Sequence, residues 1–396
     1  MLVGIPLFGG FPVLARAEAN FEIYGTAQAD YIQDFNRVDP DWSATLRPSK
    51  IPTTDGAYGS NGQAIISARQ SRFGVKGTTP VEGGEVLTYK FDFDLYGVGD
   101  NAGQTTFRLQ NFYGEWRHIL AGQTDTTFMD ASIFPDTIDY WGPAGMVYVR
   151  TPQLRWTLLS GADTFAIALE TPNTDIDLGN ARAIDPGLAD NLQADNKVPD
   201  FTTHYRAERD WGHVQLAGIL RRLGYDTAGT PGNNPSGSVT AWGLNLTSNI
   251  KSIGDDMVHL GVVYGEGIAS YMNDGGTDMA PECTVIVTFG GAVCQAGTVR
   301  AKAVPLWGVT AYYDHYWMNS FSTSLGYSET HVDNQSGQES SAFQSGKYAS
   351  VNLLWRPAKN VMTGAEFLWG QRTDHDGRSG NDSRLQFTVQ YKFSSK

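Results

Sequence analysis

The sequence has little charge for its length. Only 18% of its 396 residues are charged, whereas soluble domains have about 25%. The 29 basic and 42 acidic residues leave a net charge of −13. This charge would repel nucleic-acid phosphates, so we expect no nucleic-acid partner. Beyond the N-terminus no run of about 18 apolar residues occurs, which excludes helical membrane spans.

Signatures of catalysis and of metal binding are also missing. The sequence contains no GxSxG, HExxH or CxxC motif, and Gly346-Lys347 is not followed by the serine or threonine of a phosphate-binding loop. The seven histidines lie on different segments, and the neighbours Asp314 and His315 would point to opposite faces of a strand. We therefore expect no cofactor, no metal and no enzymatic activity. A barrel hydrolase with a site built from outer loops is the weaker alternative.

The N-terminus has the features of an export signal. Residues 1–14 are apolar and uncharged, and Ala17 and Ala19 are the small residues that a signal peptidase reads. We predict a signal peptide over residues 1–19 and a mature domain over 20–396. The basic residues that normally come first are missing, so the signal is truncated or the start is misplaced; an ordinary N-terminal strand is the alternative.

Cysteine is scarce, with two residues, Cys283 and Cys294, in one stretch of the chain. In an exported protein a local pair of this kind is typical of a disulfide. Two free thiols are the alternative.

Strand-like alternation dominates the rest of the chain, which is rich in glycine and aromatic residues. In residues 384–393, Leu, Phe, Val, Tyr and Phe alternate with Arg, Gln, Thr, Gln and Lys. This period of two is typical of a strand with one apolar and one polar face. Sixteen such runs are predicted: 21–35, 63–77, 85–97, 105–117, 119–127, 147–160, 163–171, 200–209, 213–225, 239–251, 257–268, 301–317, 319–332, 346–356, 359–371 and 383–393.

The connections between these runs alternate between short and long. Residues 80–84 and 161–162 are short turns, whereas residues 36–62, 171–199 and 269–300 are long. A transmembrane antiparallel β-barrel has short periplasmic turns, long outer loops and strands that cross about 25 Å of hydrocarbon. The sequence therefore predicts an all-β barrel of 16 strands in the outer membrane of a Gram-negative bacterium, surrounded by lipid. An exported soluble all-β carbohydrate-binding protein is an alternative.

Alternation also assigns directions to polar side chains on the second, fourth and sixth runs. We predict that Arg72, Arg108, Gln110, Arg150 and Arg155 point into the lumen. The alternative role for these arginines is to pair with Asp92, Asp94 or loop carboxylates. The same alternation places Arg69, Asn111 and Glu115 on the outer face. A charge there costs roughly 2 to 4 kcal/mol near the middle of the bilayer, so we expect these residues in a subunit contact.

Five segments carry a resemblance to a known family. They are residues 70–77 (QSRFGVKG), 107–110 (FRLQ), 122–130 (GQTDTTFMD), 134–143 (FPDTIDYWGP) and 149–155 (VRTPQLR). The chain resembles the DcaP-like outer-membrane porins. The resemblance implies a trimeric barrel whose third long loop folds into the lumen and constricts it, and a preference for anionic, carboxylate-bearing solutes. The constriction residues would be Asp130, Phe134, Asp136, Asp139 and Tyr140.

Together these observations predict a passive outer-membrane channel for small anionic solutes. We expect Asp130, Asp136 and Asp139 to face the inward arginines across a narrow gap and to create a transverse field. The alternative from another class is a structural or adhesion barrel with a plugged lumen.

Overall fold

The computed structural model describes residues 19–184, 190–227 and 235–396. It contains one large antiparallel sheet of 18 strands and two small two-stranded sheets. The predicted signal peptide, apart from its last residue, lies outside the described residues and stays a prediction.

The strands of the large sheet are β1 (Asn20–Asp34), β2 (Gln63–Ser67), β3 (Arg72–Pro80), β4 (Val86–Tyr96), β5 (Thr105–Trp116), β6 (Ile119–Asp125), β7 (Arg150–Leu159), β8 (Asp163–Glu170), β9 (Leu192–Ala194), β10 (Asp200–Arg209), β11 (Gly212–Thr227), β12 (Ser236–Lys251), β13 (Met257–Glu266), β18 (Pro305–Met318), β19 (Phe321–Val332), β20 (Phe343–Ala358), β21 (Val361–Asp374) and β22 (Ser379–Ser394). The small sheets pair β14 (Met279–Glu282) with β17 (Arg300–Ala303) and β15 (Val285–Thr288) with β16 (Gly291–Cys294). Short 3-10 helices lie in the loops: η1 (Pro40–Trp42), η2 (Pro48–Lys50), η3 (Gly99–Asn101), η4 (Ala131–Ile133), η5 (Gly179–Ala183) and η6 (Ala269–Tyr271).

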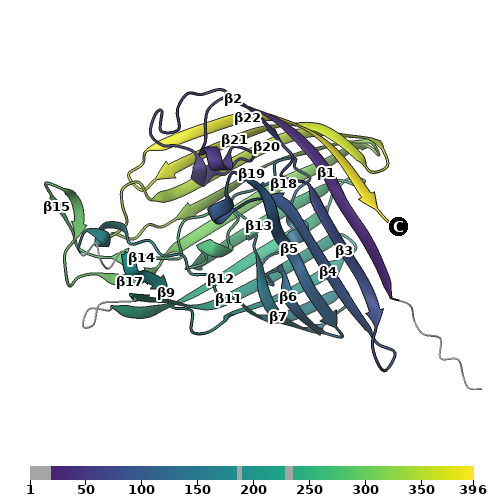
Figure 1. Ribbon diagram of the computed structural model, residues 1–396, viewed down its shortest axis with the longest axis horizontal. Helices are drawn as coiled ribbons and strands as arrows, with labels where there is room; N and C mark the ends of the chain where they lie inside the picture. Colours follow the sequence, from purple (N-terminus) through teal and green to yellow (C-terminus); the bar gives the residue numbers. More distant parts are fainter. Residues whose placement is uncertain (1–18, 185–189, 228–234) are drawn as a thin grey trace, which may run out of the picture.

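The large sheet closes on itself into a barrel (Figure 1). The seam is formed by β1 and β22, which pair from Tyr24 opposite Ser394 to Asp34 opposite Arg384. Strands β2 and β3 both pair with β1, and β9 and β10 both pair with β11. The 18 strands therefore occupy sixteen positions around the barrel, which confirms the predicted strand number.

The connections have the predicted asymmetry. The short turns, such as residues 117–118, 210–211 and 359–360, lie at the end where β1 begins and β22 ends, and the long loops lie at the other end (Figure 1). Two predicted runs differ from the observed strands. Residues 68–71 interrupt the second run, and residues 300–303 leave the barrel to pair with β14.

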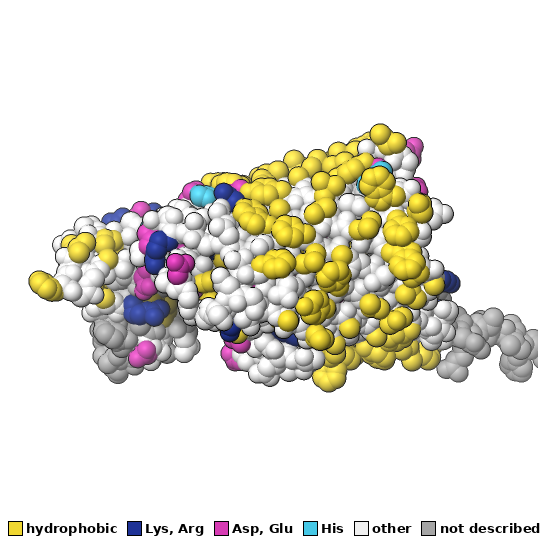
Figure 2. Space-filling view, turned by 90° about the horizontal axis from the view of Figure 1, so that it is seen from above, with side chains coloured by type: hydrophobic (Ala, Val, Ile, Leu, Met, Phe, Trp, Pro, Cys, Tyr) yellow, Lys and Arg dark blue, Asp and Glu magenta, His cyan; other side chains and the backbone are white. Residues whose placement is uncertain are grey.

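The outer face of the barrel is apolar and the inner face is polar. On β22, Phe387, Val389 and Tyr391 are 44%, 41% and 55% exposed, while Gln386 is fully buried. Figure 2 shows hydrophobic side chains over the barrel wall and charged ones among the outer loops. In the described part of the chain, no helix is both long enough and apolar enough to cross a bilayer.

The predicted outward direction of Asn111 and Glu115 is wrong because β5 contains a β-bulge. Asn111 pairs with Asp92 and Leu109 with Phe93, which leaves Gln110 without a partner in the ladder. The extra residue reverses the alternation beyond it. As a result both Gln110 and Asn111 are buried inside the barrel. Glu115 shares the inner face with its cross-strand neighbour Leu120, which is 1% exposed.

Arg69 does not face lipid either. It lies in the break between β2 and β3, where alternation no longer applies. Its side chain is 5% exposed, stacks over the ring of Tyr96 at 4.0 Å and donates a hydrogen bond to the carbonyl of Gly97 at 3.1 Å. The polar set that motivated a subunit contact is thus internal.

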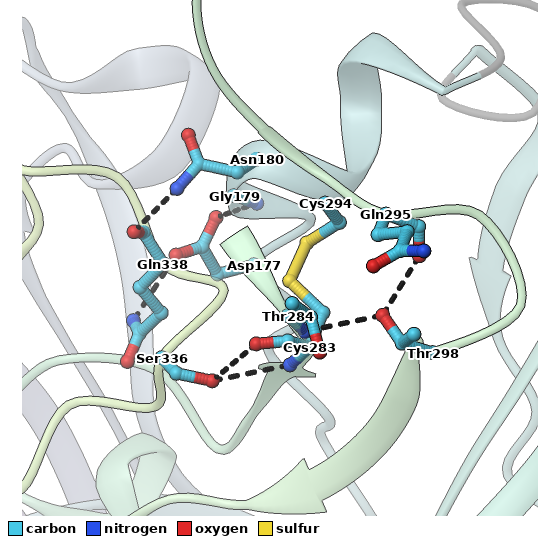
Figure 3. The surroundings of a disulfide bond; sticks show 10 residues. All are labelled: Asp177, Gly179, Asn180, Cys283, Thr284, Cys294, Gln295, Thr298, Ser336 and Gln338. Carbon is cyan, nitrogen blue, oxygen red and sulfur yellow. Dashed lines mark hydrogen bonds between the residues drawn. A yellow bond between two sulfur atoms is a disulfide. The ribbon is translucent and has the colours of Figure 1, made fainter. Parts of the chain in front are cut away.

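Hydrogen bonds fasten the outer loops to one another next to a disulfide that lies within one of them (Figure 3). Cys283 and Cys294 form the predicted disulfide at the base of the β15–β16 hairpin. The backbone amide of Cys283 donates to the Ser336 hydroxyl at 3.1 Å. The Gln338 amide in turn donates to Asp177 at 3.1 Å. Three loops, containing residues 171–184, 267–304 and 333–342, thereby form one assembly.

Candidate pore site

The segment between β6 and β7, residues 126–149, is bound to inward-facing side chains of distant strands. In its first part, Asp130 accepts hydrogen bonds from the Arg206 guanidinium at 2.9 Å and the Thr247 hydroxyl at 2.8 Å, and it lies 2.6 Å from His213 Nε2. The Asn245 amide donates to the carbonyl of Phe128 at 2.9 Å. These contacts join the segment to β10, β11 and β12.

The middle of the segment is bound to the other side of the barrel. The Glu366 carboxylate on β21 accepts hydrogen bonds from the backbone amides of Ile138 at 2.8 Å and Asp139 at 3.0 Å. The Asp139 carboxylate accepts from Thr45 Oγ1 at 2.7 Å and from the amide of Leu46 at 3.1 Å. The segment and the loop of residues 35–62 are therefore held together against β21.

The predicted transverse field is wrong because the three loop carboxylates face the wall. Asp130 and Asp139 are 4% and 2% exposed, and each binds the barrel or another loop. Asp136 pairs with Arg356. None of the three lines the cavity beside the inward arginines. Phe134 packs on Tyr148, with ring centroids 5.4 Å apart, while Tyr140 lines the cavity.

The barrel encloses a cavity of about 850 Å³ next to this segment. Arg72 on β3, Arg108 on β5 and Arg150 at the start of β7 line it together with Gln110, as alternation predicts. Arg47, from the loop of residues 35–62, contributes a fourth guanidinium. The carboxylates in the lining are Asp94 and Asp175.

Each of the three wall arginines forms an ion pair. Arg72 pairs with Asp92 and Arg108 with Asp94, both at 2.8 Å, and Arg150 Nε lies 2.8 Å from Asp125. The Asp92 and Asp94 side chains are only 1% and 5% exposed, against 33% and 22% for their arginines. Asp92 is therefore covered by its arginine, whereas Asp94 also lines the cavity and Asp125, at 35% against 16% for Arg150, is the more exposed partner of its pair. Structural ion pairs and guanidinium groups that line the cavity thus coexist here.

Aromatic rings hold the cationic groups in place. The Arg47 guanidinium lies 4.1 Å from the ring centroid of Trp42 and 4.3 Å from that of Trp141. The rings of Tyr96 and Tyr140 stack at 4.1 Å, and the Arg108 guanidinium lies 5.2 Å from the Tyr140 ring centroid. Cation–π contacts orient an arginine without neutralising it.

Asp175 is an exposed residue at the cavity, close to two other aspartates. Partial desolvation, followed by the charges of Asp278 and Asp177, raises the pKa of its carboxyl. The group therefore carries less negative charge at a given pH.

Arg155 points inward, as predicted, but lies outside this cavity. It pairs across the ladder with Leu120 and Ala168, which are 1% and 2% exposed, so all three share the inner face. Within the described residues no carboxylate lies within ion-pair distance of it, and its Nε is buried without a hydrogen-bond partner. The missing ion pair distinguishes Arg155 from the three wall arginines.

Alternation in the sequence does not point to four residues of the site, which are Arg47, Trp42, Trp141 and Glu366. The first three lie in loops, where period-two alternation gives no direction. Glu366 lies on the inner face of β21, so its direction was readable, but the segment that it binds is more than 200 residues away in sequence.

Comparisons with known proteins agree with this architecture. Residues 12–280, more than half of the chain, match the model of the DcaP outer membrane protein family. No curated protein matches the sequence. Among solved structures, the outer membrane channel DcaP of Acinetobacter baumannii is 18% identical with a TM-score of 0.77, covering 96% of this chain and 99% of that one.

More distant structures share the fold. The anion-selective porin from Comamonas acidovorans is 8% identical with a TM-score of 0.55, covering 95% of this chain and 100% of that one. OmpT of Vibrio cholerae, in a trimer form, is 11% identical with a TM-score of 0.54, covering 95% and 99%. Because more than half of the chain matches the family model and the sheet closes into a barrel of sixteen strand positions, this chain belongs to the DcaP outer membrane protein family and is a channel of the Gram-negative outer membrane.

Proposed function

We propose that the protein is a passive diffusion channel that favours small anionic, carboxylate-bearing solutes. The observation that carries the proposal is the cavity lined by Arg47, Arg72, Arg108 and Arg150 with two aspartates. A passing solute responds to the charge that lines the narrow section, because charges beyond a Debye length of about 8 Å are screened at physiological salt. The net charge of −13 therefore does not decide selectivity.

In this proposal residues 126–149 narrow the pore. The support for this is the set of hydrogen bonds from the segment to inward-facing side chains of β10–β12 on one side and of β21 on the other. The channel needs no cofactor.

The experiment is a reversal-potential measurement on the purified protein in a planar bilayer with a KCl gradient. We expect discrete conductance steps and a reversal potential of the sign set by chloride. A reversal potential of the opposite sign would remove the proposed anion preference. Intact folded protein without conductance would instead favour the plugged structural barrel.

We also propose that the channel is a trimer whose contact surface lies on β2–β5. Phe107 and Phe112 are 76% and 62% exposed, and Ile66 is 83% exposed. Outward residues elsewhere on the wall, such as Leu244 and Leu246, are 52% and 51% exposed. Phe93 and Phe107 meet edge-to-face at 4.7 Å within this aromatic surface. Large aromatic side chains dominate the energetics of protein interfaces.

Truncating this surface tests the trimer. We expect the double variant Phe107→Ala and Phe112→Ala to dissociate to monomers under detergent conditions that preserve the wild-type oligomer, as native mass spectrometry would show. The matched control is Leu244→Ala with Leu246→Ala on β12, which should leave the oligomer intact. A wild type that is monomeric in mild detergent and conducts normally would contradict the proposal.

A further inference from the structure

A group of buried polar side chains lies on the inner face of β1 and β22, the two strands that close the barrel. Asp30 on β1 is 2% exposed, and Gln386 and Thr388 on β22 are 0% and 2% exposed. Thr388 is directly opposite Asp30, and Gln386 lies two residues along the same inner face. The side chains of Thr388 and Gln386 adjoin the Asp30 carboxylate.

The 126–149 segment covers this group. The side chain of Ile138 lies over Gly364, which pairs with Thr388 across the ladder, so closely that a methyl group at Gly364 would crowd it. Ile138 is itself 2% exposed. The polar group therefore lies under the segment, next to Gln28 and Gln390, which belong to the same inner face and line the arginine-lined cavity.

Negative charge accumulates at this place. Asp30, Asp139 and Glu366 are all buried, and none forms an ion pair in the described part of the chain. The cation that acts on Asp139 is Arg384, which already pairs with Asp34 at 3.0 Å and Asp382 at 2.7 Å.

Asp139 and Glu366 each accept backbone hydrogen bonds, which compensate their burial. The donor to Asp30 is a neutral amide, that of Gln28, at 3.0 Å. Burying a carboxylate without an opposite charge is costly.

Polar side-chain atoms without hydrogen-bond partners lie on the same inner face as this carboxylate. They are the amide oxygen and nitrogen of Gln386 and the hydroxyl of Thr388, all buried without a hydrogen-bond partner among the described residues. A carboxylate, an amide oxygen and a hydroxyl are ligands that hard cations prefer. No group of three or more His, Cys, Asp and Glu in the described ranges is arranged to hold a metal ion, which disfavours a divalent or transition metal.

We propose that Asp30, Gln386 and Thr388 form a buried binding site for a monovalent metal cation, Na⁺ or K⁺. The cation would neutralise Asp30 and satisfy the open oxygen atoms of Gln386 and Thr388 at once. Because its ligands come from β1 and β22, it would join the first and last strands at the seam of the barrel. The site is independent of the proposed transport function.

The first test is thermal unfolding of the purified protein in detergent at constant ionic strength. We expect the Tm to be a few degrees higher in NaCl or KCl than in N-methyl-D-glucamine chloride, because a ligand that binds the folded state stabilises it. The variant Asp30→Asn should lose this difference. The matched control is Glu22→Gln on the same strand, whose carboxylate pairs with Lys76 at the periplasmic end; it should keep the difference.

Two further measurements apply even where Asp30→Asn does not fold. Thr388→Val, which nearly preserves shape, should raise the Na⁺ or K⁺ concentration needed for half of the stabilisation. Crystals of the wild type soaked in thallium(I) acetate should show an anomalous peak between Asp30, Gln386 and Thr388. Absence of that peak, or an unchanged Tm difference in Asp30→Asn, would overturn the proposal and leave a water molecule or a protonated Asp30 in its place.

Discussion

Replacing Arg72, Arg108 and Arg150 together with glutamine is expected to move the reversal potential of the channel towards cations. Three charges, each about 10 Å from a passing carboxylate, contribute about 1.2 kcal/mol in water, which is roughly an eightfold preference. The replacement also leaves Asp94 without its counter-charge and Asp92 with Lys90 alone, which adds to the effect. Uptake of a small dicarboxylate should fall, while uptake of a neutral sugar of equal size should barely change.

The control is an arginine that is paired with a carboxylate but lies outside the lumen. Arg117 pairs with Glu85 at the periplasmic turns, so Arg117→Gln should leave selectivity unchanged. The variant Arg155→Gln adds a separate comparison, because it removes an inward charge without exposing an aspartate. If the triple variant kept the wild-type selectivity, the cavity arginines would not determine ion preference.

Replacing Glu366 with glutamine is expected to raise single-channel conductance and to make the open current noisier. The two amides of Ile138 and Asp139 donate to different oxygens of Glu366, and glutamine keeps only one oxygen, so one of the two amides loses its acceptor and faces an NH₂ donor. A buried amide left without an acceptor costs about 1 to 3 kcal/mol. The attachment of the middle of the 126–149 segment to β21 would weaken, while the β21 ladder itself stays intact.

The control for this variant removes a carboxylate that the segment does not contact. Glu115 is inward-facing and, in the described residues, forms no hydrogen bond to residues 126–149. Glu115→Gln should shift ion selectivity slightly without increasing conductance. Equal conductance in Glu366→Gln and the wild type would contradict a constricting role for the segment.

Alternation of apolar and polar residues was sufficient to predict the strands, because lipid on one side and a polar lumen on the other impose a period of two. Alternation gives wrong directions for side chains where the backbone itself departs from that period. The bulge at Gln110 reverses the direction of Asn111. The break at residues 68–71 likewise removes Arg69 from the pattern. Neither a bulge nor a break changes the composition of the run that contains it.

The pore site was predictable in part for the same reason. Arg72, Arg108 and Arg150 lie on strands, at positions where the alternation with the adjacent residues holds, so their direction followed from those residues. The loop carboxylates could not be placed from the sequence, because their contacts are distant along the chain. Asp130 contacts His213 and Thr247, which are 83 and 117 positions away, and Asp139 contacts Thr45, which is 94 positions away. A buried carboxylate and a pore-lining one have the same local sequence signal.

The disulfide between Cys283 and Cys294 has a consequence for the assembly of the protein. It lies among the loops at the outer end of the barrel, whereas the bacterial apparatus that oxidises thiols works in the periplasm. We therefore expect the two cysteines to be joined before insertion, while residues 283–294 are still on the inner side of the outer membrane. The hairpin would then cross the membrane as a closed ring, and biogenesis of this channel would depend on the oxidising capacity of the periplasm.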